Sequence, residues 1–170
     1  YNFDAWHASS PIESKPYKRQ VIELVNDYRK SNILEIGCGL GEILAELKSP
    51  NRVGVDYDKE VINAANHLFG KNIKFLDHDF NKIDSIDLPF KEIDFLLLIN
   101  WTHEMPWSTI EKKINLLNSQ YPIGRILIDT IKEGHSDYPY HHKVEDLKKL
   151  GNIIRTVDGS NGVRVIFVID

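Results

Sequence analysis

Three glycines within five positions are the first feature of this chain that points to chemistry. Gly37, Gly39 and Gly41 come at the end of the apolar run 32–37, in the stretch NILEIGCGLGE. Glycine loses more backbone freedom on folding than any other residue, so the cluster indicates that something approaches the main chain closely. Bare backbone before a helix N-terminus favours a ligand, although a tight strand–helix turn without one has the same signature.

Two aspartates further along the chain indicate which ligand. Asp56 ends the next apolar run, where a carboxylate can accept both hydroxyl protons of a ribose. The stretch FLDHDF ends the third run, and it brings Asp79 and the Phe80 amide to where an adenine edge can be read. Each aspartate alone is more typical of a strand end or a turn. Together with the glycines, in this order, they predict an adenosine-binding crevice.

The elements that would position these residues alternate between short apolar runs and amphipathic stretches, as in βαβ units around a parallel sheet. We expect strands at 32–37, 52–56, 73–76, 94–99 and 125–131, and helices at 17–28, 42–48, 59–69, 108–119 and 144–150. The last two runs, NIIRTV and VRVIFVI, are joined only by DGSNG, a connection too short for parallel strands. The predicted fold class is therefore α/β: a Rossmann-like doubly wound sheet of seven strands, mostly parallel, with a C-terminal antiparallel β-hairpin.

The domain organisation predicted from the sequence is simple. We find no repeat, low-complexity tract or linker, so residues 1–170 are expected to form a single domain. Residues 1–30 would be an N-terminal lid and helix segment, and residues 31–170 the core. The aromatic start YNFDAWH suits a lid, but also a dimer contact or packing on the sheet.

Composition and charge narrow the possible partners and the compartment. The 170 residues carry a net charge of −4, so a strong binder of nucleic acid is not expected. No apolar run approaches the ~20 residues of a membrane helix, and the N-terminus does not read as a signal peptide. The lone Cys38 excludes an intrachain disulfide. We therefore expect a cytoplasmic protein without a nucleic-acid or membrane partner, and its oligomeric state stays open.

Four stretches resemble the motifs of class I S-adenosylmethionine-dependent methyltransferases. LEIGCGLGE resembles their first motif, VGVDYD the second, FLDHDF the third and IDFLLLINWTHEMP the fourth. The terminal hairpin is similar to the sixth and seventh strands of that family. The resemblance covers residues 32–170.

This resemblance implies S-adenosyl-L-methionine as cofactor, with S-adenosyl-L-homocysteine as product. The positions that would bind it are Glu35, Gly37, Cys38, Gly39, Gly41, Asp56, Tyr57, Asp79, Phe80, Asn100 and Trp101. The rival cofactor is a nicotinamide dinucleotide, whose loop usually reads GxGxxG. In this chain the third glycine comes one residue earlier than in that loop. Glu35 would also oppose a pyrophosphate, but it suits a cationic sulfonium or ammonium.

Methyl transfer to a hydroxyl requires a base near the end of the fourth strand. His103 is the first candidate, because imidazole titrates near neutral pH, and Glu104 is the second, as base or as the group that orients His103. Alternatively, His103 caps the following helix or packs on Trp107.

A second polar and aromatic cluster, GHSDYPYHH at 134–142, follows the fifth strand at the same edge. Acceptor binding is one interpretation of this cluster, and a solvated loop whose histidine caps the next helix is the other. The residues expected to bind the acceptor are Trp6, His7, Trp107, His135, Tyr138, Tyr140 and His141. No well-spaced ligand set appears, so no metal is expected.

The function predicted from the sequence is methyl transfer from S-adenosylmethionine to a small molecule. O-methylation of a sugar or another bacterial biosynthetic metabolite is the specific expectation. NWTH stands where an asparagine-proline-proline-aromatic motif would hold a planar amino group, which disfavours transfer to a base nitrogen. The alternatives are a non-catalytic cofactor-binding partner subunit and, less favoured, an NAD(P)-binding oxidoreductase.

Overall fold

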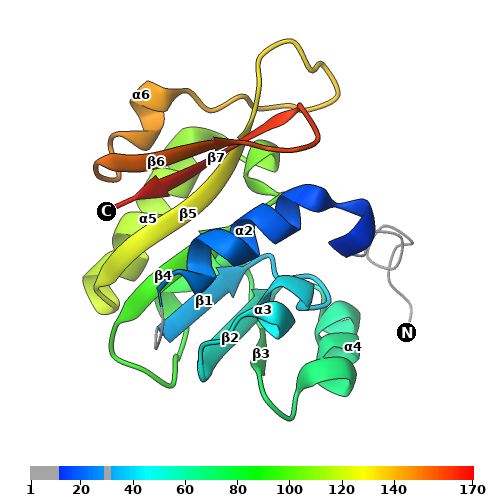
Figure 1. Cartoon of the computed structure of the whole chain (residues 1–170). Helices are drawn as coiled ribbons and strands as arrows, with labels where there is room; N and C mark the ends of the chain where they lie inside the picture. Colours follow the sequence, from blue (N-terminus) through cyan, green and yellow to red (C-terminus); the bar gives the residue numbers. More distant parts are fainter. Residues whose placement is uncertain (1–11, 29–31) are drawn as a thin grey trace.

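A single seven-stranded sheet forms the centre of the computed structural model, which describes residues 12–28 and 32–170 (Figure 1). The strands are β1 (Asn32–Ile36), β2 (Asn51–Asp56), β3 (Lys74–Asp77), β4 (Ile93–Leu98), β5 (Ile123–Ile131), β6 (Ile153–Asp158) and β7 (Arg164–Ile169). Their order is β3-β2-β1-β4-β5-β7-β6, and the pairings are parallel up to β5 and antiparallel from β5 to β7 and β6. The fold class predicted from the sequence is confirmed.

The strands are apolar because both faces of the sheet are covered. Along β1, Ile33 packs in one hydrophobic cluster and Leu34 in the other, and the neighbouring pair Phe95 and Leu96 of β4 divides in the same way. The period of two along a strand sends successive side chains to opposite faces. A continuous apolar run is therefore the pattern that a doubly covered parallel sheet requires.

Helices close both faces of the sheet. One face carries α2 (Pro16–Asn26), α3 (Glu42–Glu46) and α4 (Lys59–Phe69), whose buried residues include Val21, Leu44 and Ile62. The opposite face carries the 3₁₀ segment η2 (Phe80–Ser85), α5 (Trp107–Gln120) and α6 (Val144–Leu147). Figure 1 shows α2 in front of the sheet and α5 behind it. Two short 3₁₀ segments, η1 (Ile12–Ser14) and η3 (Thr102–Glu104), complete the elements.

Three helices end earlier than the sequence pattern indicates, and the first of them, α2, ends at Asn26 rather than 28. α3 ends at Glu46 rather than 48, since Leu47 is already extended and Pro50 disfavours a helical residue before it. α6 ends at Leu147 rather than 150, and the turn that follows leads into Gly151. None of the helices in the described ranges is long and apolar enough to cross a membrane.

The order of the strands creates a switch point beside β1. The chain runs outward from β1 to β2 and β3, then returns to place β4 on the other side. Ile36 of β1 lies opposite Val55 of β2 and Leu98 of β4, so the carboxyl ends of these strands meet at one edge. In open α/β sheets, ligands bind in the crevice at this point.

Candidate functional site

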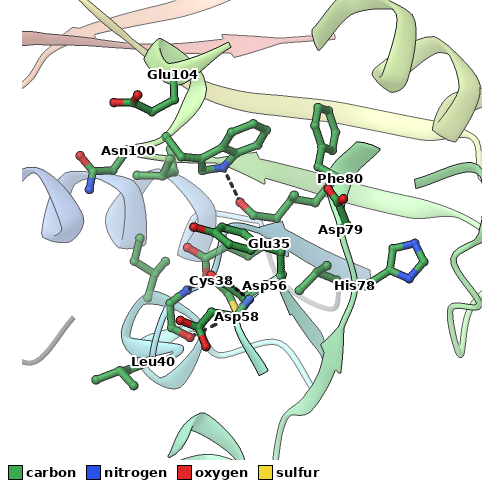
Figure 2. A pocket seen from close by; sticks show the side chains of 18 of the residues that line it. Glu35, Cys38, Leu40, Asp56, Asp58, His78, Asp79, Phe80, Asn100 and Glu104 are labelled. Carbon is green, nitrogen blue, oxygen red and sulfur yellow. Dashed lines mark hydrogen bonds between the residues drawn. The ribbon is translucent and has the colours of Figure 1, made fainter. Parts of the chain in front are cut away.

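A cavity of about 540 Å³ lies at the switch point (Figure 2). This volume is within the range of small-molecule sites, roughly 300–1,000 Å³. Its walls come from four segments that follow β1, β2, β3 and β4, together with Lys18 of α2. The residues expected from the sequence that line it are Glu35, Gly37, Cys38, Gly39, Asp56, Tyr57, Asp79, Phe80, Asn100, Trp101 and Glu104.

The three glycines of the first loop serve different purposes. All have positive φ: 71° at Gly37, 54° at Gly39 and 80° at Gly41. A Cβ on Gly37 would lie 2.4 Å from the Trp101 indole, and a Cβ on Gly41 would lie 2.5 Å from the Phe75 ring. Gly41 does not line the cavity, so its expected contact with a cofactor has no basis in the geometry. Its missing side chain makes room for a core ring instead.

Glu35 is a buried carboxyl group at the end of β1. It is 2% exposed, and its Oε2 has no hydrogen-bond partner among the described residues. Burial raises the pKa of this carboxyl to about 8, with Asp56 and Glu42 acting in the same direction and Lys18 against it. Lys18 itself pairs with Glu42 at 2.5 Å on the cavity wall. A buried acceptor without a partner suits a ligand that brings a cationic N–H donor.

Asp56 connects the glycine loop to the end of β2. Its Oδ2 accepts a hydrogen bond from the Gly39 N–H at 3.0 Å, and its Oδ1 accepts one from the Asp58 N–H at 3.1 Å. Each carboxylate oxygen has a second lone pair, so the group can still accept from a bound diol. Tyr57 stands beside it with 79% of its surface exposed, at the rim.

The segment after β3 forms another wall. Asp79 caps η2 by accepting from the N–H of Asn81 at 2.8 Å. His78 donates from Nε2 to the carbonyl of Lys82 at 2.8 Å. Phe80 is buried with its ring in the core, and it meets the Trp101 ring edge-on at a centroid distance of 4.9 Å. Asp79 and Phe80 therefore border the same cavity as Asp56.

Trp101 closes the floor between the glycine loop and Phe80. Its Nε1–H donates to the carbonyl of Ile36 at 2.6 Å, which fixes the indole over Gly37. Figure 2 shows this bond as a dashed line above Glu35.

Asn100, one residue earlier, is held by Asp129 of β5 and Arg164 of β7, which the sequence analysis missed. The sequence held one signal for these two residues: Asp129 lies inside the apolar run RILIDTI, and Arg164 lies inside the apolar run VRVIFVI.

His103 and Glu104 are neighbours, but only Glu104 borders the cavity. His103 is buried, with its ring edge-on to Tyr138 at 4.7 Å and its Nε2 at 3.3 Å from Glu104 Oε1. Burial lowers the pKa of the His103 imidazole. The geometry therefore does not put His103 in reach of an acceptor. His103 does not cap α5, whose N-cap is Pro106.

The cluster at 134–142 lies against the segment after β4 instead of in the cavity. His142 donates from Nε2 to the carbonyl of Thr102 at 2.8 Å and packs on Trp107, whose indole is buried in the core. The Tyr140 N–H donates to the carbonyl of His103 at 3.1 Å.

The predicted acceptor residues are therefore not brought together at the cavity. Trp107, His135, Tyr138, Tyr140 and His141 are absent from its walls. His141 points to the carbonyl of Lys132, with its Nδ1 at 3.1 Å. The cap of α6 is Lys143 rather than a histidine, so the solvated-loop alternative is wrong on that point. Trp6 and His7 lie outside the described residues. Within residues 12–28 and 32–170, no group of three or more side chains could hold a metal ion.

Comparisons with known proteins agree with this geometry. The sequence model of a family described as methyltransferase domain matches residues 33–119, just over half of the chain. No curated protein matches the sequence.

Solved structures share the fold at low identity. N-methyltransferase NodS from Bradyrhizobium japonicum, in complex with S-adenosyl-L-homocysteine, has a TM-score of 0.75 and 15% identity over 99% of this chain and 92% of that chain. A SAM-dependent methyltransferase from Aquifex aeolicus has a TM-score of 0.70 and 18% identity, over 99% and 98%. Magnesium protoporphyrin IX methyltransferase from Synechocystis, with bound SAM, has a TM-score of 0.68 and 16% identity, over 90% and 79%.

Proposed function

Because the chain belongs to the methyltransferase-domain family, we propose that it transfers a methyl group from S-adenosylmethionine to a small-molecule acceptor. The observation that carries the proposal is the cavity at the switch point, where buried Glu35 keeps Oε2 without a partner beside Gly37 and Gly39. Two of the similar structures described above contain bound S-adenosylmethionine or S-adenosylhomocysteine.

The residues on the cavity walls fit this cofactor. Glu35 would accept from its ammonium group, Asp56 from its ribose hydroxyls, and Asp79 with the Phe80 amide would meet its adenine. Cys38 lines the same wall, and burial raises the pKa of its thiol well above its usual value, so it stays a neutral contact. When bound, the cofactor supplies a methyl group already activated by a positive sulfur.

The acceptor would lie at the rim formed by Asn100, Trp101 and Glu104. Glu104 is the base in this proposal, because the residue lines the cavity and its side chain is 63% exposed. His103 is the residue that positions it in this proposal, since His103 Nε2 lies 3.3 Å from Glu104 Oε1. This role suits a hydroxyl acceptor, and so supports O-methylation of a sugar or another bacterial biosynthetic metabolite.

The similar structure of magnesium protoporphyrin IX methyltransferase supports a small-molecule acceptor. A net charge of −4 supports an acceptor other than nucleic acid. The single domain, the lid at residues 1–30 and the cytoplasmic location remain predictions from the sequence, as does acceptor binding by Trp6 and His7.

The test is a titration followed by a turnover assay. Calorimetry should give binding of S-adenosylmethionine and S-adenosylhomocysteine and none of NAD; binding of NAD alone would overturn the proposal in favour of an oxidoreductase. A screen with labelled methyl donor should then identify acceptors, and a chain that binds the donor but methylates none of them would instead be a cofactor-binding partner subunit.

The base is tested by Glu104→Gln with the acceptor found. We expect cofactor affinity within about twofold of wild type and a fall in kcat of roughly 10²-fold or more, the usual contribution of a general base. Glu111→Gln is the control, because Glu111 lies on α5 and does not line the cavity. Unchanged turnover in Glu104→Gln would remove Glu104 from the role.

A further inference from the structure

Asn100 has a backbone conformation that its surroundings must enforce. Within the described ranges it is the one residue other than glycine with a positive φ, at 71°. It lies two residues after the end of β4, lines the cavity and precedes Trp101. Residues that carry a side chain rarely adopt this left-handed backbone region, and such a residue remains there when neighbouring groups hold it.

A closed ring of hydrogen bonds holds Asn100 on both its backbone and its side chain. Its N–H donates to Asp129 Oδ1 at 2.7 Å, and its Oδ1 accepts from Arg164 Nη2. Arg164 Nη1 donates to Asp129 Oδ2 at 2.5 Å, which closes the ring. Asp129 is 1% exposed and Arg164 4% exposed. The guanidinium fork can make both bonds at once, whereas the single ammonium of lysine cannot reproduce that geometry.

The ring sets what Asn100 and Trp101 present to the cavity. Because Oδ1 of Asn100 accepts from Arg164, the two N–H groups of Nδ2 remain as the donors of that side chain. The Thr102 hydroxyl donates to the Asp129 carbonyl at 2.9 Å, so the same residue of β5 holds the chain on both sides of Trp101. The indole between these two anchors reaches Gly37 and the carbonyl of Ile36.

We propose that Asp129 and Arg164 are positioning residues that hold Asn100 in its left-handed conformation and thereby fix the Trp101 indole as the floor of the cavity. Replacing a buried ion pair by apolar groups is often neutral for stability, so such a pair is weak evidence of a role in stability alone. The identity of the ligand that binds above the indole rests on the proposed function. The placement of the indole is a property of the protein without ligand, and it is tested separately.

The indole N–H groups give a direct readout of this placement. The Nε1–H of Trp101 is hydrogen-bonded, whereas the buried Nε1 of Trp107 has no partner. In ¹⁵N-labelled protein, with resonances assigned through Trp101→Phe and Trp107→Phe, Arg164→Lys should shift the Trp101 signal and speed its hydrogen exchange at least tenfold. The Trp107 signal should stay in place. Arg52→Lys is the matched control, since the Arg52 guanidinium likewise donates several hydrogen bonds, to the carbonyls of Leu44, Leu47 and Asn72, away from the cavity.

Two further variants keep the test decisive. Glycine adopts positive φ without strain, so adding Asn100→Gly to Arg164→Lys should restore the Trp101 signal; failure to restore it would overturn the backbone role. Should Arg164→Lys not fold, Asp129→Leu with Arg164→Met removes both charges and tests the same point. An unchanged Trp101 signal in either folded variant would overturn the proposal.

Titration with S-adenosylhomocysteine separates the inference from the proposed function. In Arg164→Lys we expect the Kd to rise at least tenfold, with Arg52→Lys within twofold of wild type. If the wild-type protein binds no S-adenosylhomocysteine, the proposed function fails, while the indole signals still decide the role of Asp129 and Arg164. If the Trp101 signal shifts and the Kd does not change, the indole is not a binding surface and that part of the inference is wrong.

Discussion

At the scale of single residues, Glu35 is the group whose surroundings oppose its usual ionised state. A carboxyl group with an ordinary pKa near 4.5 lies fully buried, and its pKa rises to about 8. The neutral form is therefore the stable one in the protein without ligand at neutral pH. A cationic ligand group would reverse this preference, because an opposite charge at close range favours the ionised form.

Replacing Glu35 should change how stability depends on pH. The folded state binds one more proton than the unfolded state between about pH 4.5 and 8, so the free energy of unfolding falls as pH rises through this window. The slope from this group approaches about 1.4 kcal/mol per pH unit. Glu35→Gln should remove that slope and be more stable than wild type at pH 8, measured by urea unfolding at pH 5, 6.5 and 8.

The control for this experiment is Glu46→Gln, because Glu46 is an exposed glutamate on α3. It should keep the wild-type slope. A Glu35→Gln protein that loses stability with rising pH as steeply as wild type would mean that another group carries the dependence.

At the scale of elements, the strand–helix junction after β1 is shaped by packing as much as by a ligand. Gly37 makes room for Trp101, and Gly41 begins α3 beneath the ring of Phe75. The sequence pattern indicates that a close approach occurs at these positions. It does not say whether a ligand or a core side chain approaches, because a backbone without Cβ accommodates both.

Gly41→Ala should therefore destabilise the fold through two causes. Positive φ costs a residue with a Cβ roughly 1–3 kcal/mol, and the contact with Phe75 adds to it. Gly162→Ala isolates the first cause, since Gly162 has φ of 73° and nothing within 4 Å of its Cβ position. Urea unfolding should give a larger loss for Gly41→Ala than for Gly162→Ala. Equal losses of unfolding free energy in the two variants would show that the Phe75 ring moves aside without a loss of stability.

The contact of α2 with the sheet contains the hydroxyl group of Tyr17, which makes no stabilising hydrogen bond within the described residues. Tyr17 is buried, its ring lies 5.0 Å from the Arg164 guanidinium, and its OH has no partner. Tyr17→Phe should be neutral or stabilising by up to about 1 kcal/mol, because a buried hydroxyl without a partner only costs desolvation. Thermal unfolding of the variant measures this change.

Tyr121 provides the opposite case for comparison. Its hydroxyl donates to the carbonyl of Ile86 at 3.1 Å and accepts from the N–H of Leu88 at 3.2 Å. Tyr121→Phe should lose about 1–2 kcal/mol, since it leaves both groups without their partner. A larger loss in Tyr17→Phe than in Tyr121→Phe would contradict this account.

At the scale of the whole molecule, the cavity draws on both layers around the sheet. Lys18 comes from α2 on one face, Phe80 from η2 on the other, and Asp56 from the sheet between them. A ligand that spans these parts binds only the folded chain. Binding therefore stabilises the molecule as a unit, and its effect appears in global unfolding.

Saturation with S-adenosylhomocysteine should raise the melting temperature of the protein. At a concentration of about 100 times Kd the stabilisation is about 2.7 kcal/mol, which corresponds to roughly 5–11 °C for a domain of this size. Differential scanning fluorimetry measures the shift, with adenosine as the control that lacks the ammonium partner of Glu35 and should give a smaller one. No shift with S-adenosylhomocysteine would contradict the proposed site.

The sequence by itself determined the fold class, the order of most elements and the crevice after β1. Apolar runs, glycine spacing and the short terminal connection are local patterns that depend on neighbours along the chain, and each carries its own physical cause. The positions of Asp56 and Asp79 follow from the same logic, because the carboxyl ends of adjacent parallel strands must meet at one edge of the sheet. Glu35 came from the resemblance to the methyltransferase motifs.

Only the tertiary structure decided what each polar group faces. His103 and Glu104 are adjacent in sequence, yet one is buried against Tyr138 and the other lines the cavity. Asn100, Asp129 and Arg164 are separated by up to 64 residues and meet in one ring of hydrogen bonds. Such contacts depend on side-chain direction and burial across strands far apart in the chain, and these are set by packing of the complete sheet between its two layers of helices.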